Sequence, residues 1–174
     1  REPCARARIP CPPFNGSARY LEERALRSPR VASPSVVVLV LNWNDGSILE
    51  SCLRSLQQST APNIRLVVLD NGSTDGSAEI PRRLGIETYL FGTNLGFCGA
   101  YNRAFREVVR DETFVLLSNP DLFVPPETIG RMFAAAGSDP KIGFVGPVQR
   151  HMDTHAIRSA GVYWACGHLP RNVL

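Results

Sequence analysis

Continuous apolar runs alternate with amphipathic segments along the chain from residue 35 onward. Two runs rich in β-branched residues, 35–41 and 64–70, are typical of strands buried on both faces of a sheet. Weaker apolar runs predict further strands over 86–91, 113–118, 142–148 and 156–164. Between the strands, amphipathic segments predict helices over 45–59, 96–111 and 125–139, and residues 72–85 are predicted to form a loop and a short helix.

Strands that alternate with helices predict βαβ units, which build a mostly parallel sheet with helices on both faces. In such sheets ligands bind beyond the carboxyl ends of the strands, so we expect a functional site in the residues that follow each strand. Two expectations concern helix starts. Ser73 or Thr74 caps the short helix that follows, and a proline of the Pro125, Pro126 pair lies in the first turn of the last helix.

Polar side chains follow four of the predicted strands. Asp70, a carboxylate at the tip of a buried strand, suits contacts to ribose or base hydroxyl and N–H groups. Asp121 suits a divalent metal ion, because hard cations prefer carboxylate and diphosphate oxygens. Trp43 can either pack in the core or offer its ring to a base. Local capping and turn formation explain other polar residues at these positions equally well: Asn44, Asp45, Ser73 and Asp75.

Common nucleotide-binding and hydrolase motifs are absent. LNWNDGS follows the first predicted strand, where a dinucleotide-binding fold would carry G-x-G-x-x-G. Neither a P-loop nor a G-x-S-x-G elbow occurs. A nucleotidyltransferase would carry a basic, Gly-rich loop after the first strand, and LNWNDGS contains no basic residue.

The composition is that of an ordinary globular protein, with 44% hydrophobic and 20% charged residues. Residues 1–30 carry seven Arg against three Glu, whereas the rest of the chain is close to neutral. A nucleic-acid-binding body, which would show a clustered basic face, is therefore disfavoured, and no apolar run reaches the roughly 20 residues that span a bilayer. We expect residues 1–34 to be a basic Pro- and Arg-rich leader, disordered or partly helical, and residues 35–174 to form one domain.

Four segments occur in the order and spacing of a known family: SVVVLVLNWND, LVVLDNGSTDGS, TNLGFCGAYNRAFRE and FVLLSNPDLFVPP. They resemble the family 2 glycosyltransferases with the GT-A fold, and among these the rhamnosyltransferase-like branch. The resemblance covers about residues 35–148. It implies a Rossmann-like, nucleotide-sugar-binding α/β fold, of which this chain is the donor-binding part, truncated at its C-terminus.

The resemblance also implies roles for particular residues. Asn42, Trp43 and Asn44 match the segment that cradles the nucleotide base, and Asp70 matches the acid that contacts base or ribose. Asp121 matches the residue that binds a divalent ion, Mg²⁺ or Mn²⁺, together with the donor diphosphate. The remaining donor-binding matches lie in the loop and helix that close over the nucleotide-sugar and just before the metal-binding acid: Asn94, Gly96, Phe97, Asn102 and Asn119.

Asn119 stands where the fuller D-x-D motif has its first Asp. The protein therefore supplies one fewer negative charge, and metal binding should depend more on the diphosphate itself. N-x-D forms are common in the rhamnosyltransferase-like branch. The resemblance thus favours dTDP-rhamnose as donor, with a UDP-sugar left open.

The expected activity is inverting transfer of rhamnose or a hexose from the nucleotide donor to a saccharide or lipid-linked acceptor in cell-surface polysaccharide synthesis. Such transfer needs a general base, which in the family lies past the metal motif, so we expect it beyond Leu174. The alternative is a non-catalytic module that binds a nucleotide-sugar or a partner on the same fold. The irregular spacing of five Cys gives no disulfide framework and favours a cytoplasmic location. We expect the protein there, with peripheral attachment at the inner face of the membrane.

Overall fold

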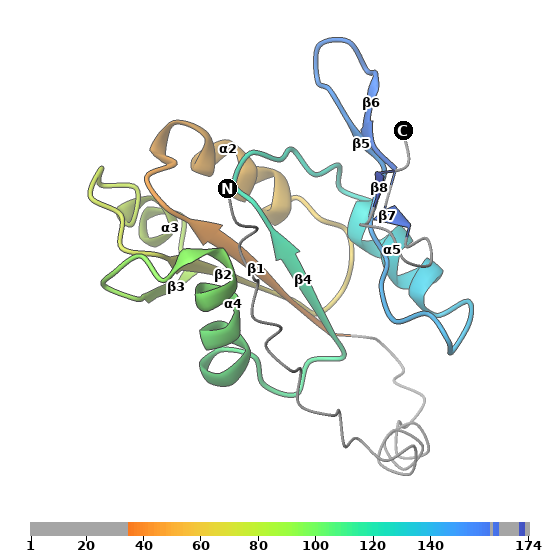
Figure 1. The fold of residues 1–174 in the computed structure, drawn as a ribbon, viewed down its shortest axis with the longest axis horizontal. Helices are drawn as coiled ribbons and strands as arrows, with labels where there is room; N and C mark the ends of the chain where they lie inside the picture. Colours follow the sequence, from red (N-terminus) through yellow and green to blue (C-terminus); the bar gives the residue numbers. More distant parts are fainter. Residues whose placement is uncertain (1–34, 161, 164–170, 173–174) are drawn as a thin grey trace, which may run out of the picture. The chain divides into compact units, whose positions relative to one another are not determined.

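The computed structural model describes residues 35–160, 162–163 and 171–172, so the leader expected over residues 1–34 lies outside the described residues. The centre of the fold is a parallel sheet of four strands in the order β3–β2–β1–β4 (Figure 1). The predicted parallel α/β architecture is confirmed. The strands are β1 (Val36–Asn42), β2 (Ile64–Asp70), β3 (Glu87–Leu90) and β4 (Phe114–Ser118).

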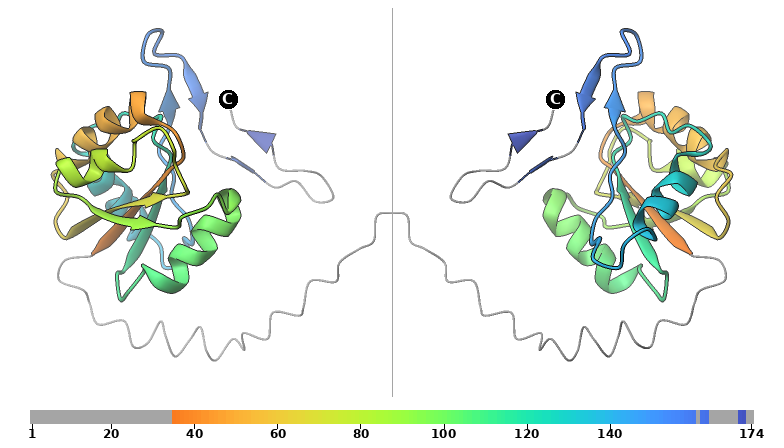
Figure 2. Two further views of the ribbon diagram at one scale, coloured as in Figure 1. Left: turned by 90° about the vertical axis from the view of Figure 1, so that its left-hand side faces the viewer. Right: turned by 90° about the vertical axis from the view of Figure 1, so that its right-hand side faces the viewer.

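Helices cover both faces of this sheet (Figure 2). Val36, Val38 and Val40 of β1 pack on the side of α2, α3 and α5. Val37 and Leu39 point to the opposite face and pack against α4. Burial of such a side chain contributes about 1.5–3 kcal/mol, and burial on both faces is why β1 reads as a continuous apolar run. The helices are α2 (Gly46–Gln57), α3 (Glu79–Arg83), α4 (Gly96–Glu107) and α5 (Thr128–Ala136).

The register of the strands places their carboxyl ends at one edge of the sheet. Asn42 is paired with Asp70 between β1 and β2, and Val40 is paired with Ser118 between β1 and β4. The residues that follow these strands therefore leave the sheet at the same edge, with β1 in the middle. We call this the carboxyl edge.

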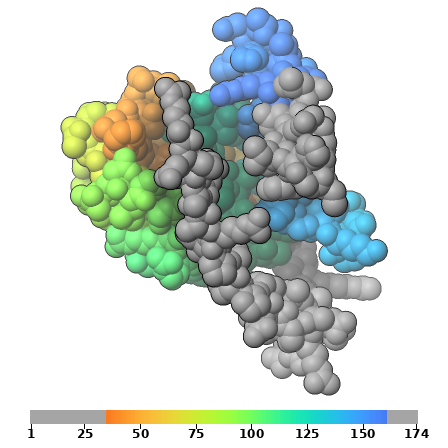
Figure 3. All heavy atoms as spheres, viewed as in Figure 1, coloured from red at the N-terminus to blue at the C-terminus, as the bar shows by residue number. Residues whose placement is uncertain are grey.

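Beyond α5 the chain forms short antiparallel pairs outside the central sheet. One is the hairpin of β5 (Gln149–Arg150) and β6 (Ile157–Ser159), and the other joins β7 (Val162–Tyr163) to β8 (Arg171–Asn172). The β5–β6 hairpin, drawn in blue, projects from the domain at the end where β1 and β4 terminate (Figures 1 and 3).

The prediction of a strand over 142–148 is wrong, because this segment has no regular secondary structure and pairs with none of the described strands. Ile142, Phe144 and Val148 are exposed, and Pro147 has no N–H to give to a ladder. The apolar pattern alone could not reveal that the segment lacks a partner strand. The strand predicted over 156–164 is replaced by β6 and β7, and its residues 161 and 164 lie outside the described residues.

Both predicted helix starts are wrong as well. Helix α3 begins after Ala78 and has no side-chain cap, so neither Ser73 nor Thr74 caps it. The Ser73 hydroxyl is instead bonded to the residues that end β1. Helix α5 begins after Glu127, which places both prolines before its first turn.

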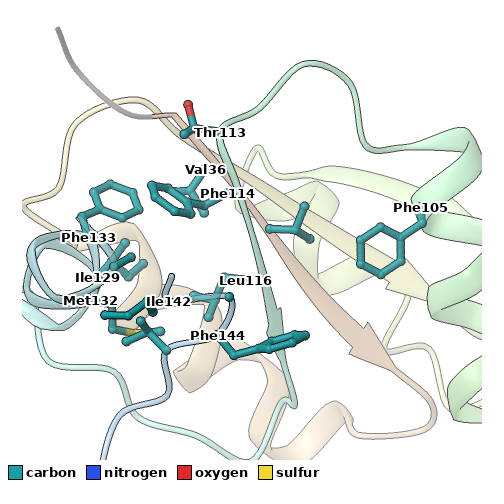
Figure 4. Close-up of a pocket in the computed structure, with 14 residues that line it drawn as sticks. Val36, Phe105, Thr113, Phe114, Leu116, Ile129, Met132, Phe133, Ile142 and Phe144 are labelled. Atoms are coloured by element: carbon teal, nitrogen blue, oxygen red, sulfur yellow. The ribbon is translucent and has the colours of Figure 1, made fainter. Parts of the chain in front are cut away.

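An apolar cavity lies beside β4 and α5, and extends to the amino ends of the strands (Figure 4). Phe114 and Leu116 of β4 line it together with Ile129 and Phe133 of α5. The rings of Phe114 and Phe133 stack with centroids 5.3 Å apart. None of the described residues that line this cavity is charged, so it holds no side-chain cation that could pair with a phosphate group.

Candidate functional site

Asn42 and Asp70 form the centre of a polar network where β1 and β2 end. The Asn42 amide nitrogen donates to Asp70 Oδ1 at 2.9 Å, and lies 3.1 and 2.9 Å from the Ser73 and Ser77 hydroxyls. Asp70 Oδ2 accepts the backbone N–H groups of Gly72 and Ser73 at 3.2 and 3.1 Å. Both central residues are buried, so the network holds the loop after β2 against the end of β1.

One polar atom of this network is unused. The buried Asn42 Oδ1 has no hydrogen-bond partner within the described part of the chain. A buried acceptor left without a partner costs about 1–3 kcal/mol, and a bound water or ligand group is the usual remedy. The carboxyl edge thus retains an acceptor that its own side chains do not satisfy.

The loop after β1 is held in place by Asn44. This residue has a φ of 59°, in the left-handed region that Asn tolerates. Its N–H donates to the Ser73 hydroxyl at 3.0 Å, and its Oδ1 accepts the Thr74 N–H at 2.7 Å. The neighbouring Trp43 is 52% exposed, which excludes the core-packing alternative and leaves its ring at the carboxyl edge.

Asp75 joins the loop after β2 to the start of helix α2. Its Oδ2 accepts the N–H of Gly46, the first residue of α2, at 3.1 Å, and its Oδ1 accepts the Ser77 N–H at 2.9 Å. Hydrogen bonds from the hydroxyl and N–H of Ser77 lower the pKa of the Asp75 carboxyl. Its negative charge is favourable at the start of a helix, a position where Asp45 makes no side-chain cap.

Two amides tie the loop after β3 to the loop after β2. The Asn71 amide nitrogen donates to Asn94 Oδ1 at 2.9 Å, and Asn71 Oδ1 accepts the Leu95 N–H at 2.9 Å. Asn94 Oδ1 also accepts the Gly96 N–H at 2.8 Å, where α4 starts. Asn94 therefore orders the beginning of α4, and Asn71 supports it.

Gly72 allows these two loops to touch. Its φ is 79°, and a Cβ atom there would lie 2.8 Å from the backbone of Thr93. We expect Gly72→Ala to lower the free energy of unfolding by about 3 kcal/mol. A side chain in the left-handed region costs about 1–2 kcal/mol, and overpacking costs about 1–3 kcal/mol more.

Gly76→Ala is the matched control, because Gly76 has a φ of 82° but open space around it. Its free energy of unfolding should fall by only about 1–2 kcal/mol, the cost of placing a side chain in the left-handed region. Urea unfolding followed by circular dichroism measures both variants. Equal losses would show that contact between the loops is not what requires Gly72.

Helix α4 links the loop after β3 to the end of β4. The Tyr101 hydroxyl donates to the Ser118 carbonyl at 3.1 Å, and burial raises the pKa of Tyr101 to about 12. Phe97 packs edge-on against Tyr101, with ring centroids 4.9 Å apart, yet stays 57% exposed. Gly96 and Asn102 are exposed too, so the beginning of α4 presents polar and aromatic groups to solvent.

Asn119 and Asp121 follow β4, on the other side of β1. The Asn119 carbonyl accepts a hydrogen bond from the Cys52 thiol of α2 at 3.6 Å, and burial raises the pKa of this thiol to about 11. The Asp121 side chain is 46% exposed, and its Oδ2 lies 3.8 Å from Nη1 of Arg158. The described residues contain no cluster of three or more His, Cys, Asp and Glu, so Asp121 offers a metal ion a single carboxylate.

The predicted residues thus fall into two groups on the carboxyl edge. Asn42, Asn44 and Asp70 share one hydrogen-bonded network, whereas Asp121 lines a cavity beside the β5–β6 hairpin that does not include Asp70. Sequence reasoning missed Ser77 and Arg158, because a Ser after a turn and an Arg on a short exposed strand carry no pattern of their own. The other predicted residues lie in the segments that follow β1, β3 and β4: Trp43, Asn94, Gly96, Phe97, Asn102 and Asn119.

A family model described as glycosyl transferase family 2 matches residues 35–160. The chain belongs to glycosyl transferase family 2. The resemblance inferred from the four motifs is therefore confirmed. A family 2 relative is the N-acetylglucosaminyl-diphospho-decaprenol L-rhamnosyltransferase of Mycobacterium tuberculosis, 31% identical over 134 residues, which are 71% of this chain and 44% of the relative.

Solved structures show the same GT-A-like fold. The mannosyltransferase PcManGT from Pyrobaculum calidifontis, in complex with GDP-Man and Mn²⁺, superposes with a TM-score of 0.59 at 24% identity, over 75% of this chain and 42% of that one. TarS 1-349 from S. aureus, in complex with UDP-GlcNAc, gives 0.56 at 21% identity, over 66% and 37%. The family 2 chain spans less than half the length of these proteins. No helix in its described part is long and apolar enough to cross a bilayer.

Proposed function

We propose that this chain provides the donor-binding part of an inverting glycosyltransferase, which moves rhamnose or a hexose from a nucleoside-diphosphate donor to a saccharide or lipid-linked acceptor in cell-surface polysaccharide synthesis. The observation that carries the proposal is the gathering of two polar groups at the carboxyl edge of a family 2 sheet. The name of the mycobacterial relative supports rhamnose as the sugar and a diphospholipid-linked acceptor.

The network around Asn42 and Asp70 suits the nucleoside end of the donor. Carboxylate and amide groups at a strand tip can bond ribose and base edges. The exposed ring of Trp43 can stack on a base. The start of α4, with Phe97 and Asn102, would cover the bound donor from the β3 side.

The residues near Asp121 fit Mg²⁺ or Mn²⁺. A lone, half-exposed carboxylate suits a hard ion that keeps several waters and takes its remaining ligands from phosphate oxygens. The complex of PcManGT with Mn²⁺ supports this choice. When bound, such an ion neutralises negative charge that grows on the leaving diphosphate.

During the transfer, one bond forms and one bond breaks at the anomeric carbon of the sugar. The acceptor oxygen bonds to the anomeric carbon as the bond from that carbon to the diphosphate oxygen breaks, and the electron pair leaves with the diphosphate. The hydroxyl proton goes to a general base. The side chains described here would bind and orient the donor, and we assign the base to none of them.

Isothermal titration calorimetry of residues 1–174 with UDP and with dTDP tests the proposal. We expect at least one nucleotide to bind, and to bind more tightly when Mn²⁺ is present. Binding of neither would contradict the proposed function. A sugar-transfer assay on the whole protein then separates an enzyme from a non-catalytic binding module, because only the enzyme turns the donor over.

A further inference from the structure

Arg158 of the β5–β6 hairpin faces the carboxylate that would bind the metal ion. Its Nη1 lies 3.8 Å from Asp121 Oδ2, and both side chains are about half exposed. The hairpin stands at the end of the sheet where β4 terminates (Figure 1). A guanidinium this far from a carboxylate, with solvent around both, makes a weak pair that can separate without a large loss of stability.

A hollow of about 280 Å³ lies beside this pair, between the segment after β4 and the hairpin. A second guanidinium, that of Arg150, also lines it and donates to the His155 carbonyl at 3.0 Å. Arg150 is therefore occupied within the hairpin, whereas the Arg158 guanidinium, among the described residues, forms an ion pair with Asp121 alone. Most other residues that line the hollow are apolar, among them Phe123, Val124, Val148 and Met152, and Thr128 and Gln149 add a hydroxyl and an amide.

The charges at this place do not balance without Arg158. A divalent ion on Asp121 leaves one net positive charge, because Asn119 contributes none. A nucleotide-sugar diphosphate carries two negative charges, and gains another as the sugar leaves. One further cation within reach of the diphosphate brings this sum to zero before transfer and offsets part of the charge that grows during it, and a guanidinium has the fork geometry that matches phosphate oxygens.

We propose that Arg158 is the second cation of the diphosphate site, an inference that rests on the proposed function. Without ligands it pairs with Asp121 and occupies the place of the metal ion. When a divalent ion takes Asp121, the guanidinium is displaced and binds the diphosphate oxygens instead. Arg158 thus opposes binding of the metal ion when no nucleotide is present, but favours binding of the metal ion and the nucleotide together.

The variant Arg158→Gln separates these two effects, because they have opposite signs. Binding of Mn²⁺ alone, measured by the electron paramagnetic resonance signal of free Mn²⁺, should become at least threefold tighter once the competing cation is gone. Binding of UDP or dTDP in saturating Mn²⁺, measured by calorimetry, should become about tenfold weaker with the loss of one charge-assisted contact. A misfolded variant would weaken both.

Two further variants serve as controls. Arg82→Gln removes an arginine of similar exposure, 62% against 56%, from an ion pair on α3, and should leave both affinities unchanged. Arg158→Lys keeps the charge but loses the fork, so it should restore the Mn²⁺ affinity of the wild type and only part of the nucleotide affinity.

The outcomes distinguish this inference from the function on which it rests. If the wild-type chain binds neither nucleotide, the proposed function fails and Arg158 loses its role with it. If the wild type binds nucleotide and Arg158→Gln binds it equally well, only the role of Arg158 is overturned. Mn²⁺ binding that is equal or weaker in Arg158→Gln also overturns it.

Discussion

Asp70→Ala is expected to lower the free energy of unfolding by about 3 kcal/mol and to abolish nucleotide binding. The carboxylate accepts one side-chain and two backbone hydrogen bonds while it is 4% exposed. Its removal leaves the N–H groups of Gly72 and Ser73 without an acceptor, while the Asn42 amide keeps only the Ser73 and Ser77 hydroxyls. Each unsatisfied donor costs about 1–3 kcal/mol where water cannot reach it, and the loop that borders the donor site would lose its order.

The Asp70→Asn variant separates the structural role from contact with the ligand. Its amide oxygen can keep the two backbone N–H groups, and its amide nitrogen can donate to the unused Asn42 Oδ1 if that side chain turns over. We expect a stability loss of only about 1 kcal/mol. Nucleotide affinity should still fall about tenfold, since a charged acceptor becomes a neutral one. Wild-type affinity in this variant would remove Asp70 from the residues that touch the donor.

Asp121→Ala is expected to remove the dependence of nucleotide binding on Mn²⁺. Among the described residues that line the cavity beside the β5–β6 hairpin, Asp121 is the one carboxylate, and its loss should weaken UDP or dTDP binding in Mn²⁺ at least tenfold, as calorimetry with and without the ion can measure. Stability should change by less than about 1 kcal/mol, because an exposed ion pair contributes little.

Asp111→Ala is the control for this change. Asp111 is also an exposed acid, but it precedes β4 and so lies at the opposite end of that strand from Asp121. Its replacement should leave both nucleotide affinity and Mn²⁺ dependence unaltered. If Asp121→Ala behaves in the same way, the metal ion is not held where we propose.

The centre of the fold could be predicted from the sequence because its residues carry an unambiguous pattern. The run from Val36 to Leu41 is apolar at every position, and only a strand covered on both faces requires that. Helices α2 and α4 could be predicted for a related reason, since one face of each is buried against the sheet and the other is polar.

The parts that could not be predicted depend on partners distant in the sequence. The apolar segment around Phe144 has the composition of a strand, but no neighbouring strand receives it. Ser73 is a residue type that often caps helices, but in the fold its hydroxyl is bonded to the Asn42 amide and the Asn44 N–H instead. Composition shows which bonds a residue can make, whereas the fold determines which partner is near.

The candidate site was predictable to the same extent. The rule that ligands bind beyond strand ends led to Asp70 and Asp121, and the strand register places both at the carboxyl edge. The ion pair between Asp121 and Arg158 joins residues 37 positions apart on elements with no shared pattern. It became visible only with the hairpin in place.

The central claim is that the Asp70 network and Asp121 border one donor site, and paramagnetic broadening tests it most directly. In an amide-resolved NMR spectrum, Mn²⁺ bound together with UDP or dTDP should broaden the signals of Leu122 and, across β1, those of Asn44 and Ser73. The nucleotide with diamagnetic Mg²⁺ should shift the same signals without broadening them. Broadening confined to the residues around Asp121, with no change at Asn44 or Ser73 on nucleotide addition, would contradict a shared site.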